Sequence, residues 1–383
     1  MRRKKLLTSL AFGLLVSCSA NGKDIKTLDK QLSELIPADE PGCSVGVFEK
    51  GKPLLRKGYG LANLELNVPM STNNVHRMAS VSKQFVAMAV LLLADQGKID
   101  LNSDIREYVS DLPDYGHKIS VHSVIGHTAG MGDYDMISSH GLPDDYDIPE
   151  GALNLKAVSG RAFRIGNEDY LTVSEFHDLV KQLPLAIEPN KTWQYSNMGY
   201  VLLAILVEEV SGKTLREFSQ ENIFEPLDMT STFFADNPTE IVPNRAYGYY
   251  RTEQGVYVNN MTNLFWVGDG GLHTTIDDMH KWDRQFYQPK LGQQPEKLMK
   301  LFMQPNSLIP VNPEEDEPLL YANGQGLRNS EHGLVARHSG GWLGASIQYE
   351  RLIEKQFMNL VMCNNVSINS AEVSKTITDW YVN

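Results

Sequence analysis

The stretch Met78–Lys98, MASVSKQFVAMAVLLLADQGK, places a serine and a lysine at the start of a long apolar run. From Lys83 to Gln96 apolar side chains cover nearly every face of a helix, and Gly97 supplies a stop signal. A helix that is apolar all round is usually buried. The stretch therefore predicts a buried helix over residues 83–96, against which the rest of the fold packs.

A second buried helix is expected from Met198 to Val210, closed by Gly212. Near the start of the chain, Cys43–Lys50 and Pro53–Gly60 are strand-like runs separated by polar turn residues, which predicts a hairpin.

Three strand patterns follow one another towards the end of the chain, at 334–341, 345–351 and 357–364, and predict a meander. Strands at both ends with helices between them predict an α+β fold, with layers of helix and sheet as in a sandwich. We expect one antiparallel sheet built from both termini, flanked by helices, with an inserted helical subdomain. The expected sheet subdomain covers residues 36–75 and 240–383, and the mainly helical subdomain covers residues 76–239.

The first seventeen residues combine a basic beginning with an apolar run too short to span a bilayer, which predicts an export signal over residues 1–17. The run Leu15–Cys18 resembles the lipobox of bacterial lipoproteins, in which the cysteine is acylated and becomes the first residue. An ordinary secretory signal that contains a cysteine is the alternative. The lipoprotein interpretation predicts a periplasmic protein with a membrane anchor at Cys18, in the outer membrane if the source is Gram-negative. A tether over 18–35 and a catalytic domain over 36–383 would follow.

Acidic residues dominate the charge. The chain has 35 Lys and Arg against 47 Asp and Glu, a net charge of −12, and removal of the four basic residues of the signal leaves 31 against 47, or −16. Such a surface repels nucleic acid and anionic lipid. We therefore expect a small-molecule or peptide substrate, and the sequence does not indicate an oligomeric state.

Neither the cysteines nor the histidines have the spacing of metal ligands. Cys43 and Cys363 lie in strand-like runs, where they form either a disulfide or two buried free thiols. The ten histidines are scattered, and the acidic run Pro143–Asp147 lacks the spacing of a calcium loop. We predict no metal or other cofactor.

Ser80 and Lys83 lie three residues apart, so on a helix they point to the same side. A serine needs a base beside it to act as a nucleophile, and a lysine in apolar or cationic surroundings has a lowered pKa. The pair therefore predicts a nucleophile with its base. The alternative is Ser80 as a helix N-cap and Lys83 as a surface-seeking stem. It is the only Ser-x-x-Lys match in the chain.

Two further patterns could complete such a site. Tyr195-Ser196-Asn197 precedes the second buried helix, so Tyr195 could relay a proton while Asn197 positions Lys83 or a substrate carbonyl. Tyr-x-Asn is weak alone and recurs at three other tyrosines: Tyr257, Tyr321 and Tyr381.

The other pattern is the run Arg337–Trp342, RHSGGW, at the end of a predicted strand. Two glycines let a ligand lie against a strand edge, and the amide of Gly341 could form an oxyanion hole with that of Ser80. The alternative is a hairpin turn made by the glycines.

Together these motifs resemble the serine β-lactamase and penicillin-binding superfamily, in particular its class C β-lactamase and DD-peptidase branch. In that family the motifs follow the order Ser-x-x-Lys, Tyr-x-Asn and Lys-or-His-x-Gly along the chain. The same order is found here, as Ser80-Val81-Ser82-Lys83, Tyr195-Ser196-Asn197 and His338-Ser339-Gly340. The resemblance extends from about residue 40 to the end. It includes three further phrases typical of the family, at 127–131 (HTAGM), 224–229 (FEPLDM) and 270–275 (GGLHTT).

The resemblance implies a β-lactamase/transpeptidase-like fold and a two-step acyl transfer. Ser80 would attack a carbonyl, Lys83 and Tyr195 would handle its proton, and the amides of Ser80 and Gly341 would hold the oxyanion. The substrate would be bound by Asn197, His338, Ser339 and Gly340.

One departure concerns the substrate. Class C β-lactamases typically have lysine where this chain has His338, and the only Lys-x-Gly, at 290–292, lies in a polar loop. Arg337 cannot simply replace the lysine, because neighbouring side chains of a strand point to opposite faces. In having histidine at this position, the chain resembles DD-carboxypeptidases, D-aminopeptidases and esterases of the family. If a protonated His338 holds a carboxylate, binding weakens above about pH 6.5.

Three functions are consistent with the sequence. The first is an exported serine hydrolase acting on a D-amino-acid peptide, a β-lactam or an ester. The second is a penicillin-binding receptor with slow or no turnover, and the third is a structural lipoprotein. The complete set of Ser80, Lys83 and Tyr195 favours the hydrolase.

Overall fold

A computed structural model describes residues 24–133, 171–262, 267–315 and 318–383 of the chain. The predicted signal, Cys18 and the acidic run 143–147 lie outside the described residues.

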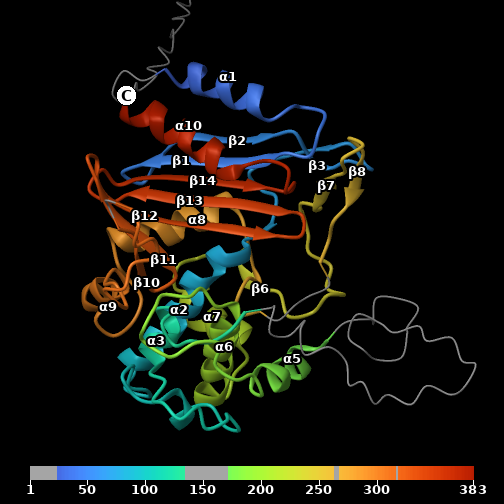
Figure 1. The fold of residues 1–383 in the computed structure, drawn as a ribbon. Coiled ribbons are helices and arrows are strands. Elements are labelled where there is room, and N and C mark those ends of the chain that lie inside the picture. Colours follow the sequence, from blue (N-terminus) through green and yellow to red (C-terminus); the bar gives the residue numbers. More distant parts are fainter. Residues whose placement is uncertain (1–23, 134–170, 263–266, 316–317) are drawn as a thin grey trace, which may run out of the picture.

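The two ends of the chain meet in one seven-stranded antiparallel sheet, in the order β10-β11-β12-β13-β14-β1-β2 (Figure 1). β14 pairs with β1 along its whole length, from Cys43 opposite Cys363 to Glu49 opposite Phe357. The predicted sheet built from both termini, the first hairpin and the final meander are therefore confirmed. The strands are β1 (Cys43–Glu49), β2 (Lys52–Tyr59), β10 (Leu320–Ala322), β11 (Gln325–Ser330), β12 (Gly333–Trp342), β13 (Ala345–Leu352) and β14 (Phe357–Cys363).

Helices cover both faces of this sheet. On one face α1 (Ile25–Leu35) and α10 (Ser370–Val382) share a core with β1, β2 and β14 (Figure 1). On the other face, α8 (Ile276–Asp283) and the helical subdomain share a larger core with residues of β13 and β14. The expected α+β architecture with helices flanking an antiparallel sheet is confirmed.

Helix α1 corrects the prediction of a tether over 18–35. Residues 25–35 are helical, Asp24 caps the helix by accepting from the Lys26 amide, and Leu28 and Leu32 are fully buried against the sheet. The amphipathic spacing of these leucines was the signal for this helix. A tether can therefore extend no further than residue 24.

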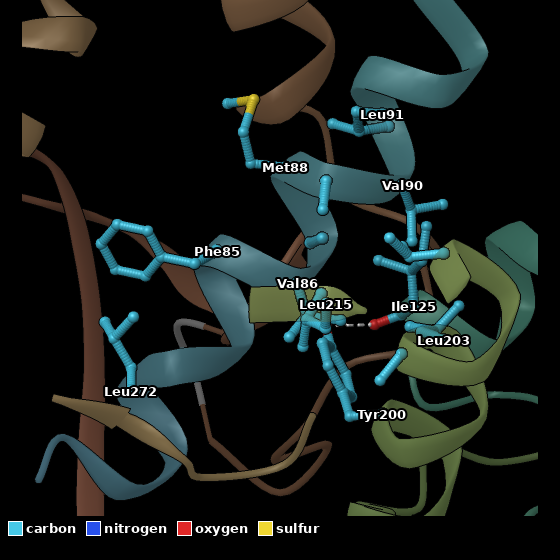
Figure 2. Close-up of a cluster of buried hydrophobic side chains, with 14 of the residues drawn as sticks. Phe85, Val86, Met88, Val90, Leu91, Ile125, Tyr200, Leu203, Leu215 and Leu272 are labelled. Atoms are coloured by element: carbon cyan, nitrogen blue, oxygen red, sulfur yellow. Dashed lines mark hydrogen bonds between the residues drawn. The ribbon is translucent and has the colours of Figure 1, made fainter. Parts of the chain in front are cut away.

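The two predicted buried helices are α2 (Lys83–Asp95) and α6 (Asn197–Ser211). Figure 2 shows their side chains packed together, with Phe85, Val86 and Leu203 in one cluster. Gly212 ends α6 in the left-handed conformation, with φ 72°, as the sequence indicated. Further helices are α3 (Val121–Ile125), α5 (Val173–Val180), α7 (Leu215–Ser219) and α9 (Pro295–Phe302).

A small three-stranded sheet joins the two subdomains. Its order is β5-β9-β6, so strands far apart in the sequence lie side by side. Its strands are β5 (His76–Arg77), β6 (Phe233–Phe234) and β9 (Leu272–Thr274); short pairs are also formed by β3 (Leu61–Asn63) with β4 (Val68–Pro69) and by β7 (Tyr249–Arg251) with β8 (Tyr257–Asn259).

Within the described ranges, no helix combines the length and the apolar character that a membrane span requires.

Cys43 and Cys363 form a disulfide across the β1–β14 pair, which decides between the two alternatives left by the sequence. Both cysteines are fully buried beneath α1 and α10. The bridge joins residues 320 positions apart and thereby fixes the pairing of the two ends of the chain.

We predict that the double variant Cys43→Ser/Cys363→Ser is less stable than the oxidised wild type by about 2–4 kcal/mol, because the bridge restricts the unfolded chain. Urea unfolding followed by tryptophan fluorescence measures the difference. Wild type treated with dithiothreitol is the control and should unfold at a similarly lowered midpoint. An unchanged midpoint in the variant would contradict the prediction.

Candidate active site

The amine of Lys83 is buried at the point where α2 begins. Its Nζ donates to three acceptors: Ser80 Oγ at 3.3 Å, Asn197 Oδ1 at 2.7 Å and the carbonyl oxygen of Asp269 at 2.6 Å. An ammonium group has three protons, and each has an acceptor here. The side chain has no exposed surface, so the alternative of a surface-seeking stem is wrong.

Ser80 lies in a single 3-10 turn, Ala79–Ser82, that leads into α2. It is not the N-cap of either helical segment; Met78 and Ser82 hold those positions, and neither makes a capping side-chain bond. The capping alternative is therefore not supported. The turn requires Ala79 to adopt φ 45°, a conformation that costs a non-glycine residue on the order of 1 kcal/mol.

Strand β12 packs directly against this turn. A Cβ atom at Gly340 would lie 2.3 Å from the carbonyl oxygen of Met78, so only glycine allows the close approach. At Gly341 a Cβ would meet nothing within 4 Å, because this residue faces open space. The two glycines thus have different tasks: Gly340 allows the packing, and Gly341 borders the cleft.

Asn197 connects Lys83 to a carboxylate that the sequence analysis missed. Asn197 Oδ1 accepts from Lys83, while Nδ2 donates to both oxygens of Asp133 at 2.9 and 3.1 Å. Its amide is thereby engaged with protein groups, which favours positioning of Lys83 over contact with a substrate carbonyl. Asp133 lies two residues after the family phrase at 127–131, and this position in the sequence could have indicated that it belongs to the site.

The pKa of Lys83 is lowered from its usual 10.5 to about 8. Burial is the main cause, and the nearby carboxylates of Asp269 and Asp133 oppose it. The surroundings are therefore not apolar or cationic, as the sequence analysis supposed. Desolvation nevertheless prevails, so a neutral amine is accessible in mildly alkaline solution.

The Tyr195 ring lies over the lysine, with its centroid 4.9 Å from Nζ. The hydroxyl is buried and makes no hydrogen bond of normal geometry with a described residue. Burial raises the pKa of Tyr195 well above its usual value, although the Ser80 hydroxyl lies near enough to oppose the shift. Tyr195 therefore keeps its proton at neutral pH.

The ring of His338 is held by two internal hydrogen bonds. Nδ1 lies 2.6 Å from the carbonyl oxygen of Ser339, which can only accept, so Nδ1 carries the proton. The hydroxyl of Tyr321 then donates to Nε2 over 3.1 Å. Neither nitrogen has a free N–H for a substrate.

The pKa of His338 is lowered to about 4, mainly by burial and further by Lys83, against the contact with Ser339. The ring is therefore neutral at pH 7. The expectation of weaker carboxylate binding above about pH 6.5 used the ordinary histidine pKa, and burial moves the pKa of His338 below that value.

A pocket of 210 Å³, the nucleophile pocket, brings the predicted groups together. Ser80 and Gly341 both border it, as the oxyanion-hole prediction requires. Its lining consists of Arg77, Ala79, Ser80, Tyr195, Asn197, Asp269, Gly270, Gly341 and Trp342. His338 and Ser339 border an adjoining pocket of 410 Å³ instead.

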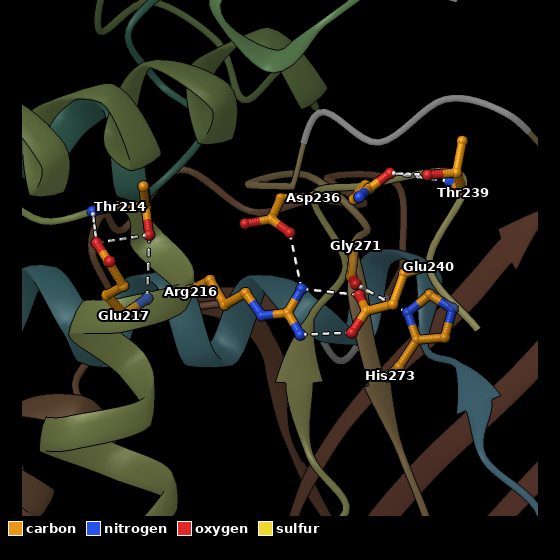
Figure 3. A network of polar contacts seen from close by, with 9 residues as sticks. Thr214, Arg216, Glu217, Asp236, Thr239, Glu240, Gly271 and His273 are labelled. Carbon is orange, nitrogen blue, oxygen red and sulfur yellow. Dashed lines mark hydrogen bonds and ion pairs between the residues drawn. The ribbon is translucent and has the colours of Figure 1, made fainter. Parts of the chain in front are cut away.

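A larger pocket, of 650 Å³, lies elsewhere, beside α5 and α7. Arg216 borders it and pairs with Asp236 and Glu240 at 2.8 Å (Figure 3). These contacts hold the segment after β6 against α7. The pocket contains no Ser–Lys pair and adjoins segments outside the described residues, so we assign no site to it.

No group of three or more His, Cys, Asp or Glu side chains is arranged to bind a metal ion in the part of the chain that the structure describes.

Comparison with known proteins places this geometry in a family. The family model described as Beta-lactamase matches residues 30–360. Penicillin-binding protein 4* of Bacillus subtilis (strain 168) is 27% identical over 360 residues, covering 89% of this chain and 71% of that protein. D-aminopeptidase of Gluconobacter oxydans (strain 621H) is 24% identical over 330 residues, covering 85% of this chain and 56% of that protein.

Among solved structures, the octameric penicillin-binding protein homologue from Pyrococcus abyssi has the same fold. The TM-score is 0.78 at 21% identity, covering 94% of this chain and 77% of that one. The resemblance inferred from the three motifs is thereby confirmed, and the chain belongs to the Beta-lactamase family.

Proposed function

We propose that this protein is an exported serine hydrolase that forms an acyl-enzyme on Ser80 and acts on an amide or ester, such as a D-amino-acid peptide or a β-lactam. The observation that carries the proposal is the desolvated amine of Lys83, 3.3 Å from the Ser80 hydroxyl. A base with a pKa near the working pH is the most effective one for removing a serine proton.

Lys83 is the base in this proposal. Its contact with Ser80 is the longest of the three, so loss of one proton leaves the lone pair directed at Ser80 Oγ. The neutral amine still donates to Asn197 and to the Asp269 carbonyl. As Ser80 attacks, its proton passes to Lys83 and the new C–O bond forms at the substrate carbonyl.

Tyr195 acts as the proton carrier to the leaving group. Because burial keeps its pKa high, it is a donor and not the initial base. Proton transfer from Lys83 through Tyr195 to the departing nitrogen or oxygen would break the scissile bond. The amides of Ser80 and Gly341, which border the same pocket, would stabilise the oxyanion, and water would then release the acyl group.

Two relatives support the choice of substrate class, since one is a penicillin-binding protein and one a D-aminopeptidase. His338 disfavours strong β-lactamase activity, because its neutral ring offers no cation for a drug carboxylate. An esterase of the same fold remains a related alternative. A receptor with slow turnover is the alternative of a different class.

We predict that benzylpenicillin or a small fluorophosphonate adds its mass to the wild-type protein and not to Ser80→Ala. Intact-mass spectrometry and peptide mapping measure the adduct. A stable penicilloyl adduct would indicate a penicillin-binding peptidase or receptor, and fast release would indicate turnover. Ser82→Ala is the matched control and should still be labelled. Failure of both reagents on the wild type would contradict Ser80 as the nucleophile.

We also propose that the mature protein is a lipoprotein of the periplasm, anchored through Cys18. The run Leu15–Cys18 supports this, and the disulfide Cys43–Cys363 is consistent with an oxidising compartment.

The expected result is that the full chain, expressed in a bacterium, partitions into Triton X-114 detergent, whereas Cys18→Ala partitions into water. Mass spectrometry should find an acylated N-terminal cysteine in the wild type only. Equal partitioning of the two proteins would refute the anchor.

A further inference from the structure

A second pocket adjoins the nucleophile pocket and shares one wall with it, Tyr195. It has a volume of 410 Å³, within the range of small-ligand sites. Four aromatic and aliphatic side chains line it: Trp193, Val311, Leu319 and Tyr321. Arg337 also lines it, and we call this the Arg337 pocket.

The Arg337 guanidinium has no hydrogen bond or ion pair with any described residue. Its cross-strand neighbour on β13 is Glu350, the natural partner for an arginine. The Glu350 carboxylate instead accepts from Thr378 at 2.6 Å. By comparison, Arg328 on the adjacent strand lies 3.6 Å from Glu315. An arginine left unpaired at the edge of a pocket is suited to bind an anion from outside the protein.

The position of Arg337 in the sheet explains how it reaches the cleft. Arg337 pairs with Gly326 in the last rung between β11 and β12, so the following residues of β12 pair with β13 alone. From His338 onward, no described strand pairs with this edge of β12. Arg337 and His338 are neighbours on a strand and so start on opposite faces of β12, but both border the pocket, as do Gln348 and Ala371. A long side chain at a strand edge can thus border the same pocket as its neighbour on the opposite face, which strand alternation alone does not predict.

Leu319 forms the apolar part of the pocket lining nearest to Arg337. A Cβ at Gly326 would lie 2.9 Å from the Leu319 side chain, so Leu319 lies directly over this glycine. Trp193 and Tyr321 continue the apolar wall towards Tyr195, with ring centroids 5.9 Å apart. A ligand reaching from Tyr195 to Arg337 would therefore pass an apolar wall and then meet a cation.

We propose that the Arg337 pocket receives the leaving-group side of the substrate, and that Arg337 selects a bulky apolar leaving group ending in a carboxylate. The inference rests on the proposed function, because Tyr195, the proposed proton donor to the leaving group, is the wall between the two pockets. The substrate class is then a peptide or amide whose last residue is large, apolar and has a free carboxylate. Among the described residues that line the pocket, Arg337 is the one fixed cation, since His338 is neutral.

The test measures competition with labelling of Ser80 by a small fluorophosphonate. The competitors are N-acetyl-D-alanyl-D-phenylalanine, its C-terminal amide and N-acetyl-D-alanyl-D-alanine. We expect the free acid with phenylalanine to protect Ser80 at concentrations about tenfold lower than the amide, and lower than the alanine analogue, throughout pH 5.5–8. Arg337→Gln should abolish the preference for the acid, and Arg337→Lys should retain part of it. Arg328→Gln, on the neighbouring strand, should behave as the wild type.

Three results would overturn the inference while leaving the proposed function intact: normal labelling with no preference for the acid, a preference that survives Arg337→Gln, or a preference lost between pH 5.5 and 8. Absence of protection by all three competitors would also overturn it. Absence of fluorophosphonate labelling in the wild type would instead refute the proposed function. The far-UV circular dichroism spectrum and the thermal unfolding midpoint of Arg337→Gln, compared with those of the wild type, establish that the variant is folded.

Discussion

The burial of one lysine amine is the constraint on which the site depends. Removing an ammonium group from water is costly unless polar groups replace the solvent. Lys83 receives those groups from two distant parts of the chain, the start of α6 at Asn197 and the segment before β9 at Asp269. These contacts offset the cost of burial, and the burial itself lowers the pKa of the amine. Burial of the Lys83 amine therefore both costs folding free energy and makes the amine a better base near neutral pH.

The sheet that joins the two ends of the chain also contributes to the site. β12, which brings Gly340 against the turn that holds Ser80, belongs to a sheet completed by the first strands of the chain. The disulfide between Cys43 and Cys363 fixes that junction. The helical subdomain packs against the opposite side of the turn through α2 and α6. The nucleophile pocket lies where the two subdomains meet, so neither could form it alone.

Much of this arrangement could be predicted from the sequence because it depends on local patterns. The all-apolar run after Lys83, the stop at Gly212 and the strand alternation near both ends each identify an element by itself. Ser80, Lys83 and Tyr195 could be proposed because their motifs begin at such elements. Contacts between distant segments could not be derived. Asp133 and the Asp269 carbonyl contribute through position alone, and Tyr321 looked like one of several chance Tyr-x-Asn matches until the fold placed it beside His338.

The central claim is that Lys83 removes the proton of Ser80, and the pH dependence of Ser80 labelling by a fluorophosphonate tests it most directly. Because only the neutral amine accepts a proton, the rate should rise with pH and level off above a midpoint near pH 8. Asp133→Asn removes a charge that stabilises the ammonium form, so its midpoint should lie at lower pH, whereas Asp114→Asn, at an exposed surface carboxylate, should leave it unchanged. A rate independent of pH, or a midpoint raised by Asp133→Asn, would contradict the account.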